Sequence, residues 1–248
     1  MKLSKRLKQI EALISADYTH IWDTCCDHGH LGTSLIAHQK APNIHLVDIV
    51  PELITPLDEK LSRLFANPYS HSHSDTNSPI PTHWQTHCLD ISKLPLQLHS
   101  GKHLVIIAGI GGDLMIECMR SIISQQPTRE IDFLLCPVRH LHTLRQQLIE
   151  LNMTLIKEVL LKDNKIFYEI LLLSNTPLPA GQLTPLNPVS PVGEAIWQGK
   201  TAKEQSDAQE YLDIKRKHYQ RMQQWLKNTE LDKVIQAYQA INIETTSN

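Results

Sequence analysis

Two carboxylates at the ends of apolar segments could bind the hydroxyl and amino groups of a nucleoside. Asp23 leads into a turn of small and polar residues over 24–29, and Asp48 ends the apolar segment 44–47. Such a turn lets a ligand approach the backbone and the positive end of the following helix. The interval of 25 residues between the two acids is close to the roughly 20 expected for a carboxylate on a ribose diol. We therefore predict an adenosine-containing cofactor at the strand ends.

Alternating strands and helices must position these acids. Apolar periodicity predicts strands near 19–24, 44–48, 84–88, 103–108 and 131–136, and helices near 3–15, 31–40, 51–65, 112–125 and 138–151. This alternation predicts an α/β fold with a parallel sheet covered on both faces. Segments 153–161 and 166–173 then form an antiparallel hairpin around Lys-Asp-Asn-Lys. Five parallel strands and a terminal hairpin is the strand count of a class I methyltransferase, whereas a dehydrogenase more often adds another crossover.

The last part of the chain differs in composition. Prolines recur over 174–193, which indicates a stiff linker, and apolar residues at helical spacing predict helices over 208–226 and 231–241. We expect a Rossmann-like domain over 1–175 and a helical, coiled-coil-like module over 176–248. Segment 67–81 is polar and rich in proline, which is typical of a surface loop.

Composition narrows the class of protein. The net charge is −2, so a nucleic-acid partner would be bound by local basic patches. The chain has no apolar run long enough to span a membrane and no signal peptide, so we expect a cytoplasmic protein. The sequence does not determine the oligomeric state, and a monomer is the favoured expectation. Five scattered cysteines indicate free thiols. His71-x-His73 and His83-x3-His87-Cys88 have tolerable ligand spacing but lack a complete ligand set, so no metal is expected.

Several motifs together resemble the bacterial tRNA (adenine(22)-N1)-methyltransferase family. Residues 23–31, Asp-Thr-Cys-Cys-Asp-His-Gly-His-Leu, are similar to its Asp-Ile-Gly-Ser-Asp-His-Ala-Tyr-Leu signature, and residues 108–112 are close to its Ala-Gly-Met-Gly-Gly. The opening 3–7, the Lys-Ile-Phe-Tyr-Glu-Ile segment at 165–170 and the basic helical extension are similar too. The resemblance covers nearly the whole chain and implies S-adenosylmethionine as cofactor and tRNA as partner, with methylation at N1 of an adenine in the D-arm region.

The resemblance also implies roles for individual residues. Asp23 would lie near the methionine amino group, Asp48 would bind the ribose with Ile49 against the adenine, and Asp90 would hold the adenine amino group. The expected cofactor site consists of Asp23, Cys25, Asp27, His28, Asp48, Ile49, Asp90, Ile91, Ala108 and Gly109. Asp27 is the candidate catalytic residue, as an acceptor for an N6 proton or a stabiliser of the methylated base; a structural acid bonding amides of the turn is an equal alternative.

Glycines and basic residues are the expected RNA contacts. Glycines beside the cofactor make room for a flat ring, and cations on the first and C-terminal helices suit phosphates. The expected substrate-binding residues are Lys5, Arg6, Gly111, Gly112, Pro137, Arg139, Lys215, Arg216, Lys217 and Arg221.

The chain departs from the family pattern in its first motif and after its fifth strand. Cys25 replaces a glycine, Asp48 replaces a glutamate, and Cys-Pro-Val at 136–138 replaces Gln-Pro-Asn. Two alternatives therefore stay open: a methyltransferase of another acceptor, and a non-catalytic module that binds tRNA or a protein partner.

Overall fold

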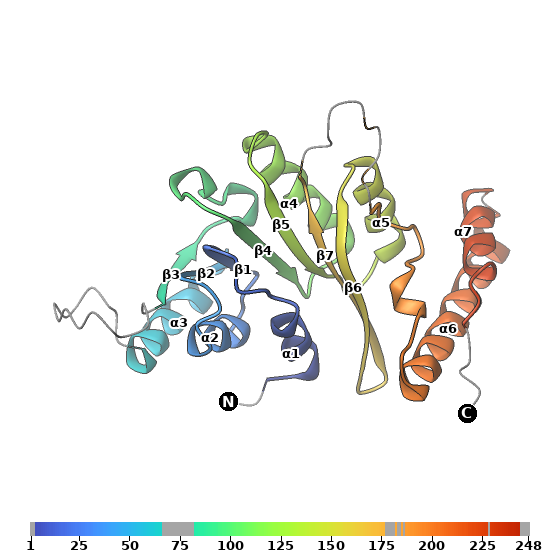
Figure 1. Ribbon diagram of the computed structural model, residues 1–248, viewed down its shortest axis with the longest axis horizontal. Helices are drawn as coiled ribbons and strands as arrows, with labels where there is room; N and C mark the ends of the chain where they lie inside the picture. Colours follow the sequence, from blue (N-terminus) through green and yellow to red (C-terminus); the bar gives the residue numbers. More distant parts are fainter. Residues whose placement is uncertain are drawn as a thin grey trace.

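A mixed β-sheet forms the centre of the protein. The computed structural model describes residues 3–65, 82–176, 182, 185, 187–227 and 229–243, without the side chain of Glu230, so the predicted loop 67–81 lies outside the described residues. Over these residues the sheet has seven strands in the order β3-β2-β1-β4-β5-β7-β6 (Figure 1). They are β1 (His20–Thr24), β2 (Asn43–Asp48), β3 (His83–Cys88), β4 (His103–Ala108), β5 (Ile131–Cys136), β6 (Thr154–Asp163) and β7 (Ile166–Ser174).

Helices cover both faces of the sheet. One face packs against α1 (Lys5–Ala12), α2 (His30–Ala37) and α3 (Pro51–Leu64), through residues such as Ile10, Leu35 and Leu57. The other face packs against α4 (Gly112–Gln125), α5 (Leu141–Glu150) and the short 3₁₀ turns η2 (Ile91–Lys93) and η3 (Leu96–Leu98). In the described chain, the connection between β3 and β4 contains only these two turns. Each of the other connections between parallel strands contains a helix of eight or more residues.

The sheet confirms the predicted fold class. Strands β1 to β5 pair in parallel, and the hairpin β6–β7 enters antiparallel with β7 against β5. The hairpin turn has Asn164 at φ 48° and Lys165 at φ 69°, the left-handed pair that matches the twist of a two-residue connection. All five parallel strands place their carboxyl ends at one edge, where the predicted acids lie.

A buried ion network attaches the C-terminal helices to the hairpin. Arg145 of α5 lies 2.7 Å from a carboxylate oxygen of Glu158 in β6 and 2.6 Å from one of Glu169 in β7. The second oxygen of Glu169 accepts a hydrogen bond of 2.7 Å from Tyr211 in α6 (Ala202–Leu226). Helices α6 and α7 (Thr229–Gln239) pack on each other and on η4 (Ala195–Trp197), at the end of the molecule opposite α3 in Figure 1. No described helix has the length and apolar character to cross a membrane.

Helix ends differ from the predicted ones for local reasons. The first helix is shorter than 3–15 because the Ser4 side chain caps it by accepting from the Leu7 amide. The long C-terminal helix begins well before 208, because Thr201 and Glu204 form a reciprocal capping box. Both signals are polar, so apolar periodicity alone does not reveal them.

Candidate active site

The turn between β1 and α2 takes a strained conformation without its expected glycine. Cys25 has φ 51°, Asp27 has φ 50° and Gly29 has φ 64°. Cys25 therefore adopts the left-handed conformation that a glycine would take, at a cost of about 1–2 kcal/mol for a residue with a β-carbon. Gly29 is less replaceable, since an added Cβ would lie 2.3 Å from Leu57 Cδ1. The sequence departure at Cys25 leaves the shape of the turn intact.

Asp23 is buried below this turn. Its Oδ2 accepts a hydrogen bond of 2.8 Å from the amide of Gly32, in the first turn of α2. Burial raises the pKa of Asp23 to about 7, Gly32 lowers it and the charge of Asp48 raises it further. A buried carboxyl in this state is stabilised as an anion by a nearby cation. The methionine ammonium expected here is such a cation, and the contact stays a prediction.

Three carboxylates from three strand ends act electrostatically on the Cys25 thiol. Burial raises the pKa of the Cys25 thiol to about 11, and the charges of Asp48, Asp23 and Asp90 add to this effect. The thiol is thus neutral and a poor nucleophile at ordinary pH. The structure brings together the three acids that the sequence analysis assigned to one cofactor.

Asp48 and Asp90 are both held by backbone amides. Asp48 accepts from the Asp27 amide through Oδ2, at 3.0 Å, and from the Val50 amide through Oδ1, at 3.1 Å. Asp90 caps η2 by accepting from the Ser92 amide at 2.8 Å, which lowers its pKa. Each carboxylate oxygen has a second lone pair, so both acids can still accept from a ligand. Ile49, beside Asp48, is 63% exposed, and Ile91 is half-buried.

Asp27 and His28 lie on the outer side of the turn. Their side chains are 66% and 68% exposed, and Asp27 Oδ1 lies 3.5 Å from His28 Nε2. The backbone carbonyl of His28 accepts from Lys60. The Asp27 backbone amide donates to Asp48 at the end of β2. The carboxylate is accessible to a ligand, and its role in the reaction stays a prediction.

The glycine turn after β4 is joined to the segment after β5. The Gly109 amide donates to Cys136 O at 3.1 Å, Val138 N to Ile110 O at 3.0 Å, and Gly112 N to Arg139 O at 3.0 Å. Gly109 has φ 90°, a conformation that side chains rarely adopt. Ala108 is half-buried, Gly111 is half-buried, and Pro137 is buried under the same rim.

Two arginines flank the glycine turn from different parts of the chain. A Cβ added to Gly109 would lie 3.6 Å from Arg6 Nη1, and one added to Gly111 would lie 3.1 Å from Arg139 Nε. The Arg6 guanidinium also lies over the Tyr168 ring, 5.4 Å from its centroid. Lys5, one residue before Arg6, is exposed. The predicted contacts on the first helix and after the fifth strand thus meet at one edge of the sheet.

The basic residues of α6 divide into two kinds. Arg216 donates to the carbonyls of Tyr238, Gln239 and Ile241, which end α7. Lys215 lies over the Tyr211 ring, and burial lowers its pKa. Lys217 and Arg221 are exposed. The structure thus gives Lys215 and Arg216 internal contacts and leaves Lys217 and Arg221 as the more accessible candidates for RNA.

Sequence reasoning missed a group of histidines on neighbouring strands: His20 and His103 begin their strands, whereas His45 is in mid-strand and His87 is next to the last residue of β3. His20, His45, His87, His99 and His103, here called the histidine cluster, come from four strands and one loop. They are separate in the sequence, and the strand order brings them together. The available signal was a histidine inside otherwise apolar strands, as in Ile44-His45-Leu46.

Comparisons with known proteins agree with this geometry. A structure of a candidate tRNA (m1A22) methyltransferase from Streptococcus pneumoniae is similar, with a TM-score of 0.70 and 16% identity over 96% of this chain and 98% of that chain. TrmK of Mycoplasma capricolum, in complex with S-adenosyl-homocysteine, gives 0.66 and 14% over 96% and 97%. The Bacillus subtilis m1A22 tRNA methyltransferase TrmK gives 0.58 and 18% over 96% and 94%.

Similarity in sequence is weaker than similarity in fold. No curated protein matches this sequence. The model of a family described as a methyltransferase domain matches residues 3–171, which include every strand but the last residues of β7. Together with the acid-lined turn and the sheet order, this match shows that the chain belongs to the methyltransferase domain family.

Proposed function

We propose that this protein transfers a methyl group from S-adenosylmethionine to N1 of an adenine in tRNA, at position 22 in the D-arm region. The observation that carries the proposal is the extent of the structural similarity. The tRNA (m1A22) methyltransferase structures match 96% of this chain, so the match includes the C-terminal helices as well as the sheet. The resemblance of residues 23–31 and 108–112 to that family supports the same substrate.

The donor set at the strand ends fits S-adenosylmethionine. Its ammonium suits the buried Asp23, its ribose hydroxyls suit Asp48, and its adenine amino group suits Asp90, because each ligand group donates to a carboxylate. When bound, the cofactor supplies an electrophilic methyl group on a sulfonium. The residues named here hold it in place, and in-line positioning accounts for most of the rate of such a transfer.

Asp27 is the group assigned to the target base. Methylation at N1 makes the adenine cationic, and a carboxylate within hydrogen-bond reach stabilises that charge or accepts an N6 proton. Asp27 has an exposed carboxylate next to the turn that holds the cofactor. Gly109 leaves room for a planar ring, since a Cβ added there would meet nothing nearer than Arg6 Nη1 at 3.6 Å, whereas Gly112 is packed against the His140 carbonyl.

Arg6 and Arg139 are the cations nearest to this position, and we assign them to the phosphates around the target nucleotide. Lys5, Lys217 and Arg221 are exposed on α1 and α6, where they suit more distant phosphates. The target base must leave its stack to reach the cofactor, so the protein must read the shape of the folded RNA.

The direct test is methyl transfer from labelled S-adenosylmethionine to unmodified tRNA, followed by digestion to nucleosides. Label in 1-methyladenosine is expected, and tRNA with adenine 22 replaced by guanine is the matched control that should stay unlabelled. Cofactor binding is measured in parallel by calorimetry. Binding without label in any tRNA would refute the proposed substrate while leaving the cofactor assignment in place.

Two alternatives are separated by the same measurements. A methyltransferase of another acceptor would bind the cofactor but transfer no methyl group to tRNA, and a Lys217→Gln, Arg221→Gln double variant would keep its activity. A non-catalytic module would bind tRNA without cofactor. Two departures support this alternative, Cys25 in place of glycine and Cys-Pro-Val at 136–138 in place of Gln-Pro-Asn, and of these Cys25 takes the left-handed conformation of a glycine.

A further inference from the structure

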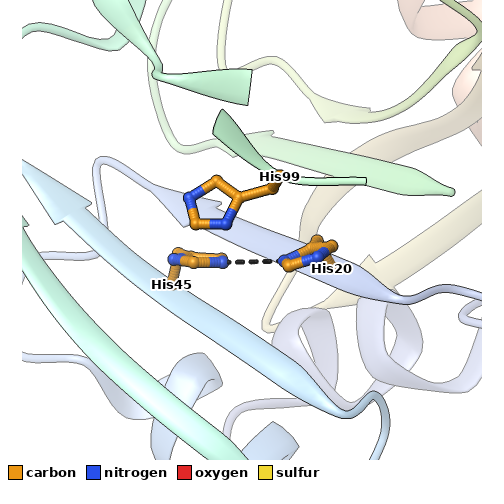
Figure 2. A group of neighbouring side chains, drawn as sticks. All are labelled: His20, His45 and His99. Atoms are coloured by element: carbon orange, nitrogen blue, oxygen red, sulfur yellow. Dashed lines mark hydrogen bonds between the residues drawn. The ribbon is translucent and has the colours of Figure 1, made fainter. Parts of the chain in front are cut away.

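Three imidazoles of the histidine cluster converge on one point. One ring nitrogen each of His20, His45 and His99 lies within 4.8 Å of the other two. His20 Nδ1 and His45 Nε2 are 3.1 Å apart and in hydrogen-bond contact. Figure 2 shows the His99 ring above this hydrogen bond, and its centroid is 4.9 Å from those of both other rings. His20 and His45 are buried, and His99 is half-buried on the loop before β4.

Hydrogen bonds fix the tautomers of the buried rings. A backbone hydrogen bond with Ser100 raises the pKa of His20, as a carbonyl acceptor does, and we assign its donor to the second ring nitrogen, which leaves a lone pair on Nδ1. His45 Nε2 therefore donates to His20 Nδ1. His45 Nδ1 then accepts from His87 Nε2, which is 3.0 Å away. The three neutral rings form a directed chain that ends at a backbone carbonyl.

These rings remain neutral at ordinary pH. Burial lowers the pKa of His20 to about 4 and that of His45 to about 2, and neighbouring histidines lower both further. Burial also lowers the pKa of His99. Neutral imidazole is the form that ligates a metal ion.

We propose that His20 Nδ1, His45 Nε2 and a ring nitrogen of His99 bind a Zn²⁺ ion, with solvent in the fourth position. Three imidazoles and one open position are a known zinc ligand set. Imidazole nitrogen also suits Cu²⁺ and Ni²⁺, which makes them competitors for the same site. The ion would join the loop before β4 to strands β1 and β2.

The distances fit this ligand set after a small movement. Zn–N bonds of about 2.0–2.1 Å place tetrahedral ligands about 3.4 Å apart. The nitrogens of His20 and His45 are 3.1 Å apart, close to this separation, but their hydrogen bond must break so that both lone pairs face the ion. The outer limit of 4.8 Å leaves about 1.4 Å to close. His99 can close it by side-chain rotation, because it is half-buried and lies on a loop.

Binding of the ion would release no proton to solvent, because the protons on the ring nitrogens only change position. The ion takes the Nε2 lone pair of His45, so the proton of this neutral ring moves to Nδ1 and is donated to His87 Nε2. His87 then holds its own proton on Nδ1. The Ser100 carbonyl continues to accept from His20. Both buried ligands thus have a hydrogen-bond partner on their second nitrogen, which is the usual support of a metal-ligating histidine.

The site is separate from the proposed methyl-transfer site. His20 begins β1, whereas Asp23 and the turn after it are at the carboxyl end of the strand. His20 and Asp23 are three residues, or about 10 Å, apart along the strand, and their odd spacing turns the two side chains to opposite faces of the sheet. His45 is in register with Trp22, next to Asp23, and lies on the same face as His20. Metal binding can be measured without cofactor or tRNA, so it succeeds or fails independently of the proposed function.

The test is a Zn²⁺ titration of chelator-treated protein, with the retained metal measured after gel filtration. We expect one tightly bound equivalent and a rise in melting temperature. His99→Ala removes a ligand at a half-buried position, so it should fold and weaken binding at least about 100-fold, the upper end of the loss from a supporting residue. His30→Ala, at an exposed histidine, is the matched control and should bind as the parent protein does.

Co²⁺ substitution identifies the ligands, because the five cysteines could also bind metal. Nitrogen ligands give d–d bands without the thiolate charge-transfer absorption in the near ultraviolet. Absence of retained Zn²⁺, equal retention by His99→Ala, or a thiolate charge-transfer band would each overturn the proposal.

Discussion

Replacing His20 by asparagine should make the protein less sensitive to acid. The Asn Oδ1 can take the place of His20 Nδ1 as acceptor for His45, so the change removes a titratable group and keeps that hydrogen bond. The contact with Ser100 is lost, which lowers stability by a similar amount at every pH. The pH dependence of unfolding therefore reports on His20 itself.

The size of the effect comes from the difference between the folded and unfolded pKa. His20 has a pKa of about 4 in the folded protein and 6.5 when exposed. Above about pH 6.5 His20 is neutral in both the folded and the unfolded protein, and its contribution to the free energy of unfolding does not depend on pH. As the pH falls from 6.5 toward 4, only the unfolded state takes up the proton, so the free energy of unfolding decreases. At about pH 5 the unfolded histidine is protonated and the folded one is not, which corresponds to about 2 kcal/mol. His103 and His87, also with pKa values of about 4, add losses of the same sign.

The assay is urea unfolding at pH 8, 7, 6 and 5 in the presence of a chelator. Between pH 8 and 5 the parent protein should lose about 2 kcal/mol more than the His20→Asn variant. Asp23 has a raised pKa and changes stability in the opposite direction, but it does so equally in both proteins. His30→Asn is the control at an exposed position and should follow the parent curve. Parallel curves for the parent and His20→Asn would refute the assignment of His20 as a buried neutral base.

Three further substitutions test the turn, the cofactor site and the ion network. Cys25→Gly removes a β-carbon from a left-handed residue, so the free energy of unfolding should rise by up to about 1 kcal/mol, and a decrease in urea unfolding would contradict the strain. Asp48→Asn should weaken S-adenosylmethionine binding about 10- to 150-fold in calorimetry, because it removes a charge-assisted hydrogen bond worth about 1.5–3 kcal/mol; unchanged affinity would exclude the ribose contact. Arg145→Leu leaves Glu158 and Glu169 buried without their cation and should cost about 3–5 kcal/mol of stability, whereas a loss below about 1 kcal/mol in calorimetric melting would show that the carboxylates find other partners.

The sheet was most predictable where its strands are continuous apolar runs, as in β4 and β5. The strands at 103–108 and 131–136 and the helix at 112–125 agree with the prediction to the residue. Buried parallel strands and their crossover helices have distinct periods, so the sequence distinguishes them. The location of Asp23, Asp48 and Asp90 was also predictable, since a residue at the end of a parallel strand must lie at the carboxyl edge of the sheet.

The histidine cluster was not predictable from spacing in the sequence. The histidine pairs at 71–73 and 83–88 were considered as metal ligands and set aside, because only their distance along the chain could be judged. His20 and His45 meet because β1 and β2 are neighbours, and His99 joins them from the loop that leads into β4. The sequence also could not show which cations on α6 are accessible. Arg216 donates to three carbonyls at the end of α7, and its position in a basic cluster does not reveal these contacts.

The buried ion network has a consequence for how RNA would be selected. Arg145 holds Glu158 and Glu169, and Glu169 also holds Tyr211 of α6, so α6 cannot turn away from the hairpin without separating buried opposite charges. Under the proposed function, the phosphate contacts of α6 and the methyl acceptor position therefore keep a constant separation. The protein would then select RNA by the distance between the phosphates bound by α6 and the target nucleotide. A tRNA lengthened or shortened by one base pair between these two points should bind through the same cations and present the wrong nucleotide to the cofactor.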